Sequence, residues 1–393
     1  MSTNEPVAAR ALSARLTALP PSGTLAVGEQ VKAQRAQGRA IFDLSGGAPD
    51  PAAPVAFADI AAITADENRL GDPRGELPLR QAFAQRLARV HDVVRSGESE
   101  MVVTVGAKQG VYFALLALIE PGDEVIIIDP CWVTYAPSVG LAGGRAVPVP
   151  LGPEDVLDVA AIRTALTPRT RALLINTPHN PTGRVFSEAE LSALVALVRA
   201  QDLWLICDES FDLFVFDGRR HLSPGAFDVV REQTILLYSF SKAFALPSAR
   251  IGMLVAPEAV ARLVANATQQ IITSVALASQ KLAYAALQKE FDWAPLLRRA
   301  YQEKRDACLA LLETEPRLMT RVPEGTFYLF PDISRTGLGG AALTRHLLAQ
   351  AGVAVTSGDA FGAAGQGHIR INLVGPLPGI LAGTRKLLEA LPS

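Results

Sequence analysis

Between residues 100 and 255 the sequence alternates between short, continuous apolar runs and segments with helical spacing. The apolar runs are expected to be strands: MVVTV (101–105), VIIID (125–129), ALLIN (172–176), LWLIC (203–207), TILLYS (234–239) and IGMLV (251–255). Strands that are apolar throughout are typical of parallel sheets, because helices cover both faces of such sheets. The pattern therefore predicts an α/β fold with a mostly parallel sheet flanked by helices.

Two of the connecting segments have the features of helices. VYFALLALI (111–119) is an apolar segment that follows the first strand after a short GAKQ turn. SEAELSALVALVRA (187–200) repeats its apolar residues at helical spacing. It also begins with Ser187 followed three residues later by Glu190, which is the signature of a capping box and predicts that a helix starts there.

The last quarter of the chain has a different pattern, which predicts a smaller α+β domain. A long helical stretch is expected near 281–314, followed by a helix near 341–351 and by three short apolar runs. Those runs are TFYLF (326–330), VAVTS (353–357) and HIRINL (368–373). The N-terminal 45 or so residues are expected to complete this domain. We therefore expect a large domain over 46–290 and a small domain over 1–45 plus 291–393.

Composition narrows the class of protein. The formal net charge of the 393 residues is -2, and no basic stripe of the kind that binds nucleic acid is present. No apolar run approaches the ~18 residues that a membrane span requires. The three cysteines are far apart and odd in number, which favours a reducing compartment over a disulfide framework. With no signal-peptide pattern at the start, the expectation is a soluble cytoplasmic protein.

Four polar motifs follow predicted strands, at the sheet edge where α/β proteins bind ligands. They are GAKQ (106–109), NTPHNPTG (176–183), Asp208, and SFSK (239–242) with Arg250 eight residues after its lysine. GAKQ opens a helix, and the backbone N–H groups of a helix N-terminus suit a phosphate. A buried Asp208 is costly without a cationic partner. Taken singly, each motif has a simpler explanation as a turn, a helix cap, a structural ion pair or a solvated lysine.

Together, these motifs resemble those of the class I/II aminotransferases, which are pyridoxal-phosphate enzymes of fold type I. The resemblance rests on HNPTG (179–183), the Asp after an apolar strand, S-x-S-K with its later Arg, and a late I-R-I (369–371). It extends over nearly the whole chain. It implies pyridoxal 5′-phosphate as cofactor, an amino acid and a 2-oxo acid as substrates, and a homodimer with active sites at the subunit interface.

The resemblance makes Lys242 the catalytic residue. It would form a Schiff base with the aldehyde of the cofactor and then move the proton between substrate Cα and the cofactor. A lysine can do this only as a free amine near neutral pH, and confinement beside other cations lowers its pKa. The apolar and small residues around Lys242 agree with that requirement.

The resemblance also assigns the other cofactor contacts. Four groups would bind the phosphate: Ser239, Arg250 and the backbone at Ala107 and Lys108. Asp208 would pair with the ring nitrogen, which makes the ring an electron sink. Asn180 would donate to the ring oxygen O3′, and Trp132 would stack on the ring face. For Trp132 the alternative is ordinary core packing.

Arg370 corresponds to the arginine that grips the substrate α-carboxylate, and the backbone of Gly47 corresponds to a second contact with that group. Asn180 and Trp132 would border the substrate as well. LPPSGTLAV (19–27) resembles a P-S-x-T segment of bacterial aspartate and prephenate aminotransferases. By that resemblance Ser22, Thr24 and Lys108 would contact a distal carboxylate and favour aspartate or glutamate. The alternatives for these three residues are a helix cap and a solvated lysine; for Arg370 it is a salt bridge on a strand face.

The sequence departs from the family pattern at two tyrosine positions. Phe211 stands where relatives have a phenol that donates to O3′, so the pKa of the imine at Lys242 is expected to rise. Leu70 stands where relatives have a tyrosine that reaches the phosphate of the partner subunit, and Arg74 is a candidate to compensate. Ala249 replaces a tryptophan common in aspartate aminotransferases. These departures keep open a relative that performs elimination, replacement, cyclisation or oxidation.

A regulatory protein of the same fold is a third possibility. Such proteins carry a helix-turn-helix DNA-binding domain ahead of the aminotransferase-like part. Here only about 45 residues precede the GGAPD segment, and they contain no basic recognition helix. The sequence therefore favours an enzyme.

Overall fold

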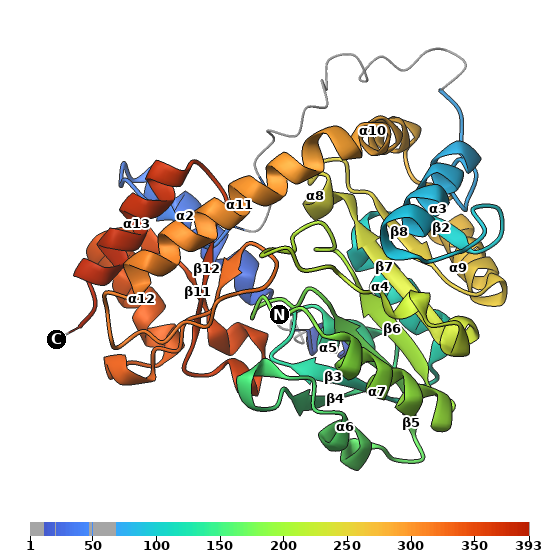
Figure 1. Ribbon diagram of the computed structural model, residues 1–393, viewed down its shortest axis with the longest axis horizontal. Helices are drawn as coiled ribbons and strands as arrows, with labels where there is room; N and C mark the ends of the chain where they lie inside the picture. Colours follow the sequence, from blue (N-terminus) through green and yellow to red (C-terminus); the bar gives the residue numbers. More distant parts are fainter. Residues whose placement is uncertain (1–11, 20, 47–48, 50–67, 393) are drawn as a thin grey trace, which may run out of the picture.

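The computed structural model describes residues 12–19, 21–46, 49 and 68–392. Its centre is a seven-stranded sheet with the strand order β2-β8-β7-β6-β5-β3-β4 (Figure 1). The strands are β2 (Met101–Thr104), β3 (Glu124–Asp129), β4 (Arg145–Pro150), β5 (Thr170–Asn176), β6 (Trp204–Asp208), β7 (Thr234–Ser239) and β8 (Gly252–Val255). Only β8 runs antiparallel to its neighbours. The prediction of a mostly parallel sheet is therefore confirmed.

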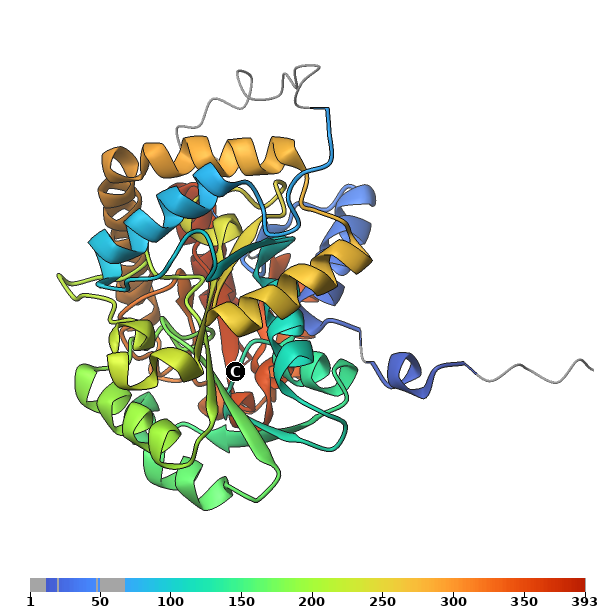
Figure 2. The same ribbon diagram turned by 90° about the vertical axis from the view of Figure 1, so that its right-hand side faces the viewer.

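Helices cover both faces of this sheet, as the apolar strands predict. One face packs against α4 (Gly106–Leu118), α5 (Tyr135–Leu141) and α9 (Glu258–Ile271). The other packs against α3 (Leu77–His91), α6 (Val159–Ala165), α7 (Glu188–Ala200) and α10 (Leu277–Gln288). Successive strand residues belong to opposite cores: Leu173 joins the second and Leu174 the first. Figure 2 shows α6 and α7 on one side of the sheet and α4 on the other.

The helix α7 begins as expected. The Ser187 hydroxyl accepts a hydrogen bond from the Glu190 backbone N–H at 3.3 Å, and the Glu190 carboxylate accepts one from the Ser187 N–H at 2.8 Å. The capping box is thus complete.

One strand of the sheet was not predicted. β4 has the sequence RAVPVP, and its two prolines argue against a central strand. The strand lies at the edge and pairs only with β3, so the missing proline N–H groups cost no ladder hydrogen bond.

The C-terminal part and the N-terminal segment form a second, smaller unit. Its three-stranded antiparallel sheet has the order β11-β12-β9, and β1 pairs in parallel with β10. The strands are β1 (Phe42–Asp43), β9 (Tyr328–Leu329), β10 (Val353–Ala354), β11 (Thr356–Ser357) and β12 (Ile369–Asn372). The helices are α2 (Gly23–Ala36), α11 (Glu290–Leu312), α12 (Gly340–Ala351) and α13 (Leu377–Glu389). A single-turn helix, α1 (Ala14–Thr17), precedes them.

Two predicted elements of this part are present but interrupted. The helical stretch expected near 281–314 is two helices, α10 and α11, which are separated at Lys289. The strand expected at 353–357 is split into β10 and β11, which belong to different sheets. Figure 1 shows α11 running from the smaller unit toward α10 on the large sheet. Within the described part of the chain, no helix is both long and apolar enough to span a membrane.

Candidate active site

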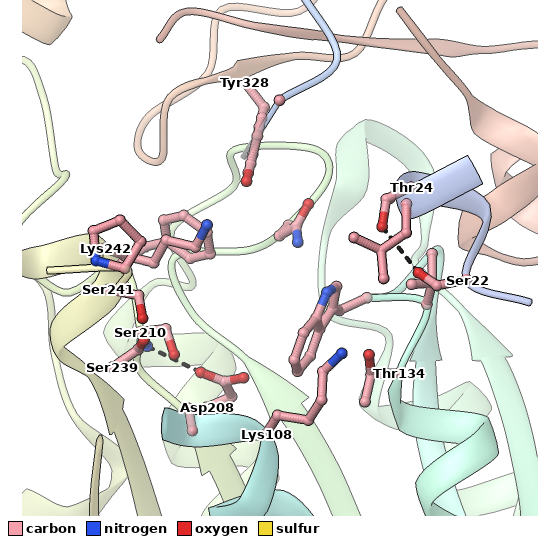
Figure 3. Close-up of a pocket in the computed structure, with 18 of the residues that line it drawn as sticks. Ser22, Thr24, Lys108, Thr134, Asp208, Ser210, Ser239, Ser241, Lys242 and Tyr328 are labelled. Atoms are coloured by element: carbon pink, nitrogen blue, oxygen red, sulfur yellow. Dashed lines mark hydrogen bonds between the residues drawn. The ribbon is translucent and has the colours of Figure 1, made fainter. Parts of the chain in front are cut away.

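A cavity of about 430 Å³ lies between the carboxyl ends of the large-sheet strands and the smaller unit. Eleven of the twelve predicted site residues line it: Ser22, Thr24, Ala107, Lys108, Trp132, Asn180, Asp208, Ser239, Lys242, Arg250 and Arg370. The twelfth, Gly47, lies outside the described residues. Parallel strands end at a common edge, which explains why motifs far apart in the sequence meet here. Figure 3 shows Lys242, Asp208 and Lys108 projecting into one space.

Lys242 lies in the single-turn helix α8 (Phe240–Ala243), directly after β7. The residue is half-buried, and its Nζ lies 5.6 Å from the centre of the Phe327 ring. Burial lowers the pKa of Lys242 to about 7, with further lowering by Arg370 and Arg250 and a smaller opposing effect of Asp208. A substantial fraction of this side chain is therefore a free amine at neutral pH.

Arg250 lies beside the N-terminus of α4. Gly106 opens the helix with φ +71°, and a Cβ at this position would lie 2.7 Å from Nη2 of Arg250. Only a glycine therefore lets the guanidinium lie so close to the helix N-terminus. Arg250 is held there by a 3.1 Å hydrogen bond from Nη1 to the Ser241 hydroxyl. A helix N-terminus beside an arginine suits a phosphate.

Asp208 is a buried carboxylate at the end of β6. It accepts hydrogen bonds from the Tyr135 hydroxyl at 2.8 Å and from the Ser210 backbone N–H at 3.0 Å. Among the described residues it forms no ion pair, and burial raises its pKa. A buried carboxylate without a cation is costly, so this one suits a ligand that brings a protonated nitrogen.

Arg370 is a buried guanidinium in β12. Its Nη1 donates to Oδ1 of Asn180 at 2.9 Å, and the guanidinium lies 4.0 Å from the centre of the Tyr328 ring. Its Nε is buried and has no hydrogen-bond partner within the described structure. The arginine is thus available to a carboxylate from outside. Because Oδ1 of Asn180 accepts the hydrogen bond from Arg370, the NH₂ group of Asn180 can donate to another partner.

Ser22 and Thr24 lie at the start of α2, and their hydroxyl oxygens are 3.1 Å apart. Ser22 occupies the N-cap position, but its side chain makes no capping hydrogen bond. The simple helix-cap explanation for Ser22 is therefore not supported. Lys108 is exposed, and its Nζ lies 5.3 Å from the centre of the Trp132 ring. Partial burial of its amine, and then Arg250, lower its pKa. In Figure 3 Ser22, Thr24, Thr134 and Lys108 lie together.

The two residues that replace family tyrosines, Phe211 and Leu70, differ in burial. Phe211 is buried, and its ring lies 5.3 Å from that of Phe327 and 5.7 Å from that of Tyr328. Leu70 is 76% exposed. Arg74, the candidate to compensate for Leu70, donates to the carbonyl oxygen of Ser99 at 2.8 Å and does not line the cavity.

Several lining residues were not identified from the sequence, notably Tyr135, Ser210 and Tyr328. Tyr135 follows Trp132 by three residues in the PCWVTY segment, and this proximity was the only available signal. Tyr328 stands in the TFYLF run, whose pattern predicts only a strand.

Comparison with known proteins adds independent information. A family model described as aminotransferase class I and II matches residues 41–377. An arginine–pyruvate transaminase from Pseudomonas aeruginosa is 37% identical over 346 residues, which is 86% of each chain. A probable aspartate/prephenate aminotransferase from Aquifex aeolicus is 33% identical over 97% of this chain and 99% of its own. Among solved structures, aspartate aminotransferase from Thermus thermophilus with maleate has a TM-score of 0.92 and 33% identity, covering 97% of this chain and 100% of that one.

Proposed function

The chain belongs to the class I and II aminotransferases, a family that uses pyridoxal phosphate, and we propose that its cavity binds this cofactor with Lys242 as the covalent attachment point. Like its relatives, the protein transfers an amino group from an amino acid to a 2-oxo acid. The observation that carries the proposal is the setting of Lys242, whose pKa is lowered to about 7 in the cavity that Asp208 and Arg250 also line.

The chemistry of the lining residues fits the cofactor. Arg250, Ser239 and the backbone of Ala107 and Lys108 at the start of α4 form the proposed phosphate site. Asp208 is the proposed partner of the ring nitrogen, because it is buried without a cation among the described residues. The NH₂ group of Asn180 is the proposed donor to the ring oxygen, because its Oδ1 already accepts from Arg370, and Trp132 supplies an aromatic face. When bound, the cofactor supplies an electron-withdrawing ring that stabilises negative charge on the substrate Cα.

Lys242 is the proposed proton carrier. Its neutral amine can take the proton from Cα of the substrate and then deliver it to the cofactor. A pKa near 7 places this group where it can both accept and release a proton at physiological pH. An ordinary lysine, with a pKa near 10.4, would stay charged and could not act as a base.

Arg370 is the proposed site for the α-carboxylate of the substrate. Its guanidinium is buried, its Nε has no partner among the described residues, and Asn180 orients it. Gly47, outside the described residues, stays a proposed second contact. Trp132 and Asn180 border the same space. Orientation by a forked guanidinium holds the substrate in one pose and lowers the entropy cost of reaction.

We propose a dicarboxylic amino acid, aspartate or glutamate, as the amino donor. Ser22, Thr24 and Lys108 provide two hydroxyls and an amine at one end of the cavity, which suit a second carboxylate. The Thermus thermophilus structure contains maleate, which is a dicarboxylate, and this supports the choice. Relatives with other substrates, including arginine and aromatic amino acids, are the competing possibilities.

A single-turnover experiment tests this function. Cofactor-loaded protein is mixed with each common amino acid, and the visible spectrum and the products are followed. We expect aspartate and glutamate to discharge the cofactor colour fastest and to yield 2-oxo acids of unchanged carbon skeleton. Ammonia, an unsaturated product or a cyclic product would instead favour one of the other reactions considered for this fold.

Replacing Lys108 with methionine is expected to lower kcat/KM for aspartate by about 10- to 100-fold, since a hydrogen bond to a charged group contributes about 1.5–3 kcal/mol. The backbone N–H in the proposed phosphate site is unchanged by this substitution. Alanine, which has no distal carboxylate, serves as the matched control substrate, and its kcat/KM should change less than about twofold. An equal loss for both substrates would place Lys108 in cofactor binding only.

The oligomeric state, the domain limits and the location in the cell are also proposals. A homodimer is supported by an apolar groove of about 840 Å³ that shares Ser22, Lys108 and Arg250 with the cavity and includes Tyr112 and the 58% exposed Ile271. For the proposed domains, 46–290 and 1–45 plus 291–393, the pairing of β1 with β10 supports the assignment of the N-terminal segment to the small domain. A cytoplasmic location is supported by three free cysteines, all buried.

A further inference from the structure

Each of two neighbouring carboxylates at the end of β6 accepts a hydrogen bond from a tyrosine. Asp208 accepts a hydrogen bond from the Tyr135 hydroxyl at 2.8 Å, and Glu209 accepts one from the Tyr238 hydroxyl, also at 2.8 Å. All four side chains are buried. Successive strand residues face opposite sides of a sheet, and the two tyrosines belong to the cores on opposite faces. Of the two acids, Asp208 lines the cavity and Glu209 does not.

The two acids differ in what else they contact. Glu209 also accepts from the Ser223 hydroxyl at 2.6 Å and lies 2.9 Å from Nε2 of His221. These partners outweigh burial, so the pKa of Glu209 is lowered. For Asp208 burial outweighs the hydrogen bonds from Ser210 and Tyr135, so its pKa is raised. Each donor to Asp208 therefore has a larger share in keeping this carboxylate ionised.

The hydroxyl of Tyr135 donates a hydrogen bond to Asp208 and does not lose its proton. Burial and the nearby Asp208 raise the pKa of Tyr135 well above its usual value, so its hydroxyl stays protonated. The ring packs edge-on against Trp132, with centroids 5.5 Å apart. Its backbone N–H donates to the carbonyl oxygen of Trp132 at 3.0 Å, at the start of α5. The hydroxyl is thus fixed relative to both Asp208 and the proposed stacking residue.

We infer that Tyr135 is a positioning residue that holds Asp208 ionised and aimed into the cavity, so that the proton shared with a bound ring nitrogen stays on the nitrogen. This inference rests on the proposed cofactor site. In a carboxylate–pyridine pair, the proton can lie on the nitrogen, which gives two charges, or on the carboxylate, which gives none. A hydrogen bond donated to the carboxylate favours the charged arrangement, in which the ring withdraws electrons most strongly.

The test compares Tyr135→Phe with Tyr238→Phe, because each removes one hydroxyl that donates at 2.8 Å to a buried carboxylate. The full chain is titrated with pyridoxal phosphate and with its analogue in which carbon replaces the ring nitrogen. We expect Tyr135→Phe to weaken binding of the natural cofactor by about 10-fold more than binding of the analogue. For Tyr238→Phe the ratio of the two dissociation constants should equal that of the unmodified protein.

Two outcomes would overturn the inference or its premise separately. If Tyr135→Phe weakens both ligands equally, Tyr135 serves only packing. If the unmodified chain binds neither ligand, the proposed cofactor site itself is wrong. Should Tyr135→Phe fail to fold, Tyr135→3-fluorotyrosine keeps the shape and strengthens the donor. It should then shift the ratio of dissociation constants in favour of the natural cofactor, and an unchanged ratio would contradict the inference.

Discussion

Lys242→Ala is expected to lower the rate of amino transfer by about 10⁴-fold or more. Loss of a positioned general base alone costs about 10²- to 10⁴-fold, and loss of the covalent attachment adds to this. The large effect is expected because Lys242 can act as a base. Burial, Arg370 and Arg250 lower its pKa to about 7, so a fraction of the molecules carry a neutral amine at neutral pH. The measurement is the rate of 2-oxo acid formation in a single turnover of cofactor-loaded protein.

A suitable control for this variant is Lys386→Ala. Lys386 is an exposed lysine of α13 that pairs with Glu389 at 2.8 Å and lies outside the cavity. Its removal should leave the single-turnover rate within about twofold of the original, since a surface ion pair contributes about 0–1 kcal/mol to stability and nothing to the site. Added methylamine, which fits the space left by the side chain, should restore part of the activity of Lys242→Ala. Full turnover without Lys242 would refute its assigned role.

Much of the large sheet could be predicted because its strands carry an unambiguous signal. Residues such as Leu173 and Leu174 face opposite cores, so neither face needs polar residues and the runs are apolar throughout. β4 lacks this signal because an edge strand exposes one side, tolerates prolines and contains an exposed arginine, Arg145. The two-residue strands β10 and β11 are equally hard to predict, since their pairing depends on distant partners.

The candidate site also contains some residues that the sequence pattern could bring together and others that it could not. The motifs at strand ends could be brought together from the sequence, because the parallel strands β5, β6 and β7 end at one edge of the sheet. Arg370, Ser22 and Thr24 come from the smaller unit, whose position over that edge has no sequence signal, and only the family resemblance linked them to the site. The role of Tyr135 could not be predicted, because its contact with Asp208 spans 73 residues and depends on where α5 begins.

Asp208→Asn is expected to reduce catalysis by about 10²- to 10⁴-fold. The substitution keeps the size of the side chain and an oxygen that can accept from Tyr135, but it removes the negative charge. Breaking a buried charge pair by neutralising one partner costs about 3–5 kcal/mol, and each 1.36 kcal/mol corresponds to about tenfold. The ring nitrogen would then lose its proton, so the cofactor would withdraw electrons less strongly. Weaker cofactor binding, measured by titration, should accompany the loss of rate.

Glu209→Gln separates this electronic effect from a general loss of stability. Glu209 is also buried beside β6, but its hydrogen bonds connect it to Tyr238, His221 and Ser223 and not to the cavity. We expect this variant to melt at a lower temperature because His221 and Tyr238 lose a charged partner, while the rate per folded, cofactor-loaded molecule stays within about threefold. If Asp208→Asn and Glu209→Gln lowered that rate equally, the charge of Asp208 would have no special part in the reaction. A rate lost only in Asp208→Asn would instead tie catalysis to the one acid of the pair that faces the cavity.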